Sequence, residues 1–118
     1  MIMRDFTMRE YPKRIRKALL ELKMEAHERE ISEHLDGLWG KFQEWKEGKI
    51  CAGELSVLIH EYDRGPSRRM FSLYNDLDPD LCVASAITKG RIKPEEVAEE
   101  VLEAIQPRID AFAKLQEK

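Results

Sequence analysis

Residues 12–47 read PKRIRKALLELKMEAHEREISEHLDGLWGKFQEWKE, and this stretch decides the fold. Its apolar residues recur every three or four positions, which is the period of an amphipathic helix. They fall on two overlapping stripes, Ile15, Leu19, Leu22 and Ala26 on the first, and Leu20, Met24, His27, Ile31, His34 and Leu38 on the second. The second stripe has the alternating steps of four and three of a heptad pattern. A helix with so wide an apolar face is expected to meet two different partners.

Two glycines, Gly37 and Gly40, weaken the second half of this helix. Each costs about 1 kcal/mol in a helix interior relative to alanine. The helical spacing nevertheless continues through Leu38, Trp39, Phe42 and Trp45. We therefore expect the helix to run on to Glu47, with a break at Gly37 as the alternative.

The apolar segments that follow also have helical spacing, and the breaks between them carry residues typical of helix ends. Helices are predicted over residues 53–64, 66–77 and 79–89 and from residue 94 onward. Gly65-Pro66 is expected to separate two of them, and Pro107 to kink or restart the last. No stretch alternates with the period of two that a half-buried strand requires. The sequence therefore predicts an all-α single domain over residues 1–118, a compact bundle of five or six helices with one long N-terminal helix.

Composition narrows the class of protein. The 118 residues are 42% hydrophobic and 36% charged, which is too apolar for a disordered chain. The longest near-apolar run, residues 81–87, is far short of the roughly 20 residues that span a bilayer, so no membrane role is expected. No secretory signal is visible, and the only two cysteines, Cys51 and Cys82, lack a CxxC spacing. These features predict a cytoplasmic protein with reduced thiols, and the many Glu, Lys and Arg residues hint at a thermophilic source.

Charge is distributed in blocks. Residues 1–24 hold seven Lys or Arg and three acids, whereas residues 25–47 hold three and seven. We interpret residues 1–11 as a basic N-terminal arm, expected to pair with acidic blocks of its own chain or of a neighbouring chain. Residues 84–101 have the outline of a helix-turn-helix, but the second helix is rich in glutamate, the wrong sign for DNA. Nucleic acid is therefore not an expected partner.

The histidines supply one candidate metal site. His27, Glu30 and His34 could present nitrogen and oxygen ligands from one helix face. Di-metal sites in helical bundles, however, use a Glu three residues before each His, and that spacing is absent here. We expect two half-buried histidines at a helix–helix seam, and neither a metal nor a cofactor.

The densest polar cluster lies at residues 60–69, HEYDRGPSRR. A helix restarting after Gly65-Pro66 would offer free backbone N–H groups, which suit an anion. The candidate anion- or ligand-binding residues there are His60, Asp63, Ser67, Arg68 and Arg69. The alternative is an interhelix turn whose charges are solvated or paired.

An aromatic group surrounds Gly37 and Gly40, and its candidate interface residues are Leu38, Trp39, Phe42 and Trp45. Aromatic residues are favoured at interfaces because they bury much area at little cost in side-chain entropy. A long helix with two apolar stripes also suits a two-fold dimer, with one stripe on its own core and the other on the mate.

Two functions from different classes therefore stay open. The leading hypothesis is a small interaction or assembly module that acts as a homodimer, with an unidentified protein partner. The alternative is a ligand-binding or enzymatic domain with an anion site at the 60–69 junction. A flat apolar patch through Trp39 and Trp45 would favour the first. A concave pocket joining the 60–69 residues to His27 or His34 would favour the second.

Overall fold

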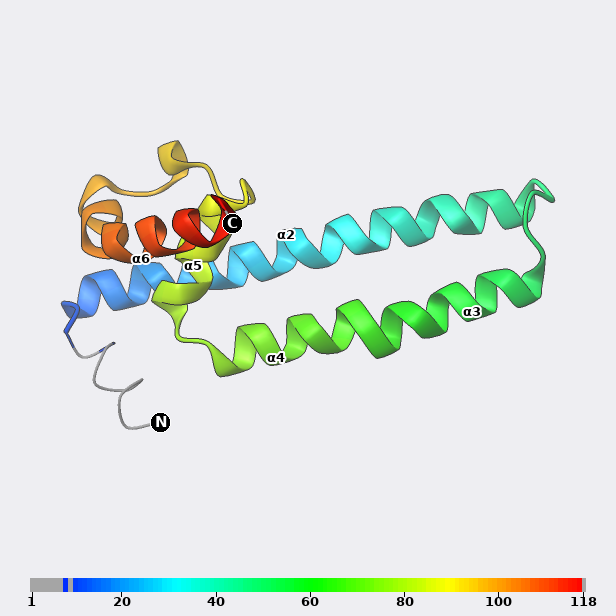
Figure 1. The fold of residues 1–118 in the computed structure, drawn as a ribbon, viewed down its shortest axis with the longest axis horizontal. Coiled ribbons are helices and arrows are strands. Elements are labelled where there is room, and N and C mark those ends of the chain that lie inside the picture. Colours follow the sequence, from blue (N-terminus) through cyan, green and yellow to red (C-terminus); the bar gives the residue numbers. More distant parts are fainter. Residues whose placement is uncertain (1–7, 9, 118) are drawn as a thin grey trace.

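The computed structural model describes residue 8 and residues 10–117, so most of the predicted basic arm, residues 1–11, lies outside the described part. The chain runs through α2, α3, a π-helical turn η1, α4, α5, a 3₁₀ turn η2 and α6 (Figure 1). These described residues contain no strand, which confirms the all-α prediction. None of their helices is apolar over a stretch long enough to span a membrane.

Helix α2 (Lys13–Lys46) is continuous over 34 residues, which corresponds to a length of about 50 Å. It starts after Pro12, whose missing N–H leaves no intrahelical bond unmade at that position. It runs through Gly37 and Gly40 and ends just before Gly48, which takes a positive φ of 78°. The predicted continuation to Glu47 is therefore confirmed to within one residue, and the alternative break at Gly37 is wrong.

The return path is one rod made of α3 (Ala52–Tyr62), η1 (Asp63–Ser67) and α4 (Arg68–Asp76), which runs back alongside α2 (Figure 1). The predicted break at Gly65-Pro66 is wrong, because the backbone stays helical from Tyr62 to Arg68. A π turn is wider than an α turn, and it accommodates Pro66, which has no backbone N–H to donate. The described chain therefore forms four helical rods rather than five or six helices.

The C-terminal elements pack on the first half of α2 and on α4, and we call this part the head (Figure 1). Helix α5 (Pro79–Thr88) begins after Asp78, as predicted, and crosses the head with six of its ten residues buried and the other four half-buried. Helix α6 (Glu99–Glu117) starts five residues later than predicted and runs through Pro107. The delay arises because Pro94–Glu96 forms only the turn η2, after which Val97 is extended and buried. The core of the head comprises Tyr11, Ile15, Leu19, Ala26, Met70, Tyr74, Cys82, Val83, Ala86, Ile92, Val97, Val101 and Ile105.

The molecule is elongated, with extents of 54 × 31 × 30 Å and a Cα radius of gyration of 17.5 Å. A compact chain of this length has a radius of about 13–14 Å, so the expected compact bundle is wrong. The reason is that the second half of α2 and all of α3 extend beyond the head as a two-helix hairpin (Figure 1). We call residues 32–62 the arm, which is distinct from the basic N-terminal arm predicted at residues 1–11. Its only buried residue is Leu55.

Candidate functional site

The most conspicuous surface feature is a row of exposed apolar side chains along α2, which we call the α2 stripe. Its members are Leu20, Met24, Leu35, Trp39, Phe42 and Trp45. At 3.6 residues per turn these positions fall within an arc of about 120°, on the opposite side of the helix from the core residues Leu19 and Ala26. Two of these apolar side chains lie largely in solvent, since Met24 is 65% exposed and Trp39 is 63% exposed. The stripe extends from the head to the tip of the arm.

The aromatic end of the α2 stripe is hollowed. A depression of about 250 Å³ is lined by Trp39, Phe42, Gln43, Trp45, Lys46 and Glu47. The Lys46 ammonium group lies 5.0 Å from the centroid of the Trp45 ring, a cation–π distance. Such a depression can receive an apolar side chain from another molecule and exclude water around it.

Of the four predicted interface residues, Trp39, Phe42 and Trp45 are exposed on the α2 stripe. Leu38 is half-buried, because it lies beside α3 in a groove that Leu58 and Tyr62 also line. Three of these side chains are therefore exposed on the arm, whereas Leu38 lies against the hairpin's own second helix.

The histidines of the heptad pattern point towards the return rod. The His27 ring stacks on Tyr74, with centroids 4.3 Å apart and planes 15° apart. His34 lies against the Tyr62 ring at a centroid distance of 5.8 Å. The Tyr74 hydroxyl donates a hydrogen bond of 2.8 Å to Glu30, and burial together with this bond raises the pKa of the phenol.

The candidate metal ligands His27, Glu30 and His34 thus already have partners. The two histidines contact aromatic rings, and Glu30 accepts a hydrogen bond from a hydroxyl group. Across the residues that the structure describes, no group of three His, Cys, Asp or Glu side chains is close enough to hold a metal ion.

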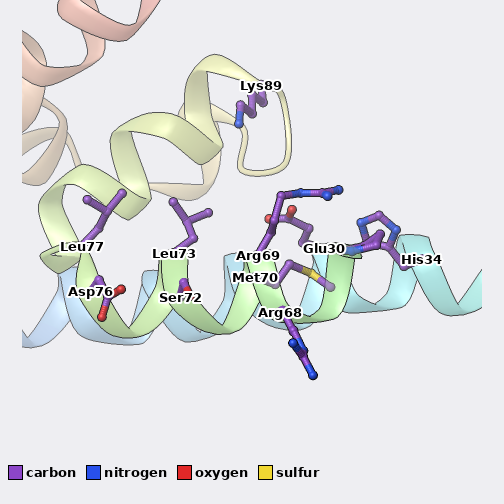
Figure 2. A pocket seen from close by; sticks show the side chains of 11 residues that line it. Glu30, His34, Arg68, Arg69, Met70, Ser72, Leu73, Asp76, Leu77 and Lys89 are labelled. Atoms are coloured by element: carbon purple, nitrogen blue, oxygen red, sulfur yellow. The ribbon is translucent and has the colours of Figure 1, made fainter. Parts of the chain in front are cut away.

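The structure does not build the anion site in the form predicted for residues 60–69. Because the rod is continuous, α4 has no free N-terminus, and the Arg68 N–H already donates to the Gly65 carbonyl. His60 and Asp63 are exposed, and Ser67 is half-buried in the π turn. Figure 2 shows the Arg68 and Arg69 side chains pointing to opposite sides of α4.

A different concave site does involve this region. A cavity of about 650 Å³ lies between α2, α4 and the end of α5, and it joins Pro66, Arg68 and Arg69 to His34 and Glu30 (Figure 2). His60, Asp63 and Ser67 do not line it. Sequence reasoning missed most of its wall, namely Met70, Ser72, Leu73, Asp76, Leu77 and Lys89. The helical period marks Met70 and Leu77 as apolar, but no sequence signal brings Lys89 next to α4.

Charged groups elsewhere in the head fasten its elements together. The Arg29 guanidinium donates to Glu96 at 2.6 and 2.9 Å and to the Arg91 carbonyl at 2.7 Å. These bonds to Arg29, and one from the Lys93 backbone N–H, lower the pKa of Glu96 to about 2. Arg91 in turn donates to Glu33 at 2.9 Å. The segment between α5 and α6 is therefore held against α2 by ion pairs, which explains these side chains without a ligand.

Comparison of the chain with protein-family models, curated proteins and solved structures finds no match. The geometry of its own residues is therefore the basis for a functional conclusion.

Proposed function

We propose that this protein is an assembly module that forms a homodimer through the α2 stripe. The observation that carries the proposal is the imbalance in the arm: residues 32–62 bury Leu55 alone and expose Leu35, Trp39, Phe42 and Trp45. Helices in proteins are stabilised mainly by packing of an apolar face. A two-helix hairpin with one buried residue needs a further surface to pack on.

The size of the exposed patch fits an interface. Trp39, Phe42 and Trp45 are 63%, 36% and 37% exposed. Since a buried aromatic side chain covers 150–250 Å², these three alone leave about 300 Å² of apolar surface uncovered. The largest apolar patch on a typical monomer is about 300–600 Å² and is often functional. Leu20, Met24 and Leu35 add further exposed apolar surface along α2, with Met24 and Leu35 about 16 Å apart along the helix axis.

A second copy of the chain is the partner that fits this surface best. The α2 stripe follows a helix of 34 residues, and the partner must offer an apolar face of similar length. A second α2 has that length and carries the same stripe. Two-fold interfaces use the same patch on both subunits, and two hairpins packed face to face form a four-helix bundle.

Sedimentation velocity tests the proposal. The wild-type chain is expected to sediment as a dimer at tens of micromolar. Trp39→Ala should weaken the dimer by at least about tenfold, since buried Trp residues are typical hot spots. Phe71→Ala is the matched control, because Phe71 is a 68% exposed aromatic residue on α4, outside the stripe. Both side chains are exposed, so neither change should unfold the chain.

Two results would overturn the proposal. One is a wild-type chain that remains monomeric throughout this concentration range. The other is an equal effect of Trp39→Ala and Phe71→Ala, which would mean that the α2 stripe is not the contact surface.

A ligand-binding role is the second candidate, and one observation favours it: the cavity of about 650 Å³ joins Arg69 to His34. Its lining differs from the set predicted at residues 60–69, and it points to a specific class of ligand.

A further inference from the structure

We propose that the cavity between α2, α4 and the end of α5 binds a small amphiphilic anion. Its negatively charged head would lie between Arg69 and Lys89, and its apolar body would lie on Leu73 and Leu77. This proposal does not depend on the dimer, because no member of the α2 stripe lines the cavity.

The cavity wall carries both acidic and basic side chains. Glu30 already has partners, since it accepts the Tyr74 hydroxyl at 2.8 Å and lies 3.7 Å from the Arg91 guanidinium. The side chains of Arg69 and Lys89, by contrast, make no hydrogen bond or ion pair with any residue in the described part of the chain. Two exposed cations that form no ion pair with a described residue thus border the cavity, in a chain whose net charge is −3.

The α4 side chains that line the cavity extend to two different sides of the helix (Figure 2). In Figure 2, Arg69, Leu73 and Leu77 extend from α4 towards the side on which Lys89 lies. Asp76, the second acid of the wall, extends the opposite way (Figure 2). The helical period places residues 69, 73 and 77 in one row, so the charged end of the row is continuous with an apolar surface.

The shape and lining of the cavity define the class of ligand. A volume of about 650 Å³ is in the range of small-molecule sites, which are mostly apolar with a few polar groups that orient the ligand. Met70 at the base is buried, while Leu73 and Leu77 are half-buried. A guanidinium binds a carboxylate through two parallel hydrogen bonds. A carboxylate on a short alkyl chain therefore satisfies both parts of the wall.

Isothermal titration of the full chain with octanoate tests this proposal. We expect saturable binding in the millimolar range or tighter. Octanol has the tail without the charge, and acetate has the charge without the tail, so both should bind at least about tenfold more weakly. Arg69→Ala and Lys89→Ala should each weaken octanoate binding by about tenfold. Arg64→Ala removes the same charge from an exposed residue outside the cavity wall and should change the affinity by less than about twofold.

Three results would overturn the proposal: no saturable heat with octanoate, equal binding of octanol and octanoate, or equal effects of Arg64→Ala and Arg69→Ala. Loss of octanoate binding in Trp39→Ala, with Arg69→Ala unaffected, would place the ligand on the α2 stripe and would also contradict it. Sedimentation of Arg69→Ala separates the two proposals, because this variant should dimerise like the wild type.

Discussion

The Tyr11 hydroxyl donates a hydrogen bond of 2.9 Å to the Asp80 carboxylate, although 69 positions separate the two residues. Asp80 is fully buried on α5 and also accepts a hydrogen bond of 3.0 Å from Arg108 on α6. Burial, followed by the bond to Asp80, raises the pKa of Tyr11 to about 12. This one carboxylate therefore joins the residue that precedes α2 to both C-terminal helices of the head.

Asp80→Ala should lower the free energy of unfolding by about 3 kcal/mol, because it leaves the Tyr11 hydroxyl and the Arg108 guanidinium without their acceptor. Urea unfolding at one fixed protein concentration measures the loss. Asp110→Ala removes an exposed acid from α6 and should stay within about 0.5 kcal/mol of the wild type. A loss of less than about 1 kcal/mol for Asp80→Ala would show that the buried carboxylate does not hold the head together.

The Arg29–Glu96 pair should make the head sensitive to acid. The pKa of Glu96 is lowered from 4.5 to about 2, so its contribution to stability is complete above pH 4.5 and is lost as the pH falls to about 2. Glu96→Gln should therefore be less stable than the wild type at neutral pH, and the difference should disappear between these two pH values. Urea unfolding as a function of pH measures it. Glu95→Gln, at the exposed neighbouring position, should show no such convergence, and a pH-independent gap for Glu96→Gln would contradict the assignment.

The two cysteines should differ strongly in reactivity. Cys51 is exposed and caps α3, where its sulfur accepts the Glu54 N–H at 3.4 Å. Cys82 is buried in the head, and burial raises the pKa of its thiol to about 11. A chromogenic disulfide reagent should label one thiol per native chain rapidly and the second only on unfolding, because the thiolate is the reactive form. Cys51→Ser should abolish the rapid phase, and a rapid phase that survives this change would be contrary to the burial of Cys82.

Two glycine replacements should have opposite effects. A Cβ at Gly40 would meet no atom within 4 Å, so Gly40→Ala should stabilise the chain by about 1 kcal/mol through helix propensity. Gly90 follows α5 with a φ of 82°, and Gly90→Ala should cost about 1–2 kcal/mol. Thermal unfolding of both variants at the same concentration measures the contrast. Stabilisation by Gly90→Ala would argue against the left-handed turn.

Sequence reasoning succeeded where a local period decides the structure. The apolar spacing of α2 was strong enough to carry the helix through Gly37 and Gly40. The small apolar residues of α5 correctly marked it as the buried element of the head. Gly65-Pro66 misled, because a π turn absorbs a proline that an α-helix would not, and no local pattern distinguishes the two. Joining α3 and α4 into one rod also produced the elongated shape.

The same contrast between local and long-range features applies to the candidate sites. The exposed aromatic row of the arm is a property of one helix, so the helical spacing was sufficient to single out Trp39, Phe42 and Trp45. The cavity is a property of three elements, and Lys89 reaches it only because of how α5 crosses the head. The π turn removed the helix N-terminus on which the predicted anion site depended, and the fold places Arg69 in the wall of the same cavity as Lys89, which is distant in sequence.

If a second copy of the chain covers the α2 stripe, sedimentation equilibrium of the wild-type protein should detect the dimer. The chain has a mass of 13.8 kDa. At tens of micromolar, the account predicts twice that mass, falling towards the chain mass on dilution. A mass of one chain at every concentration up to that range would contradict it.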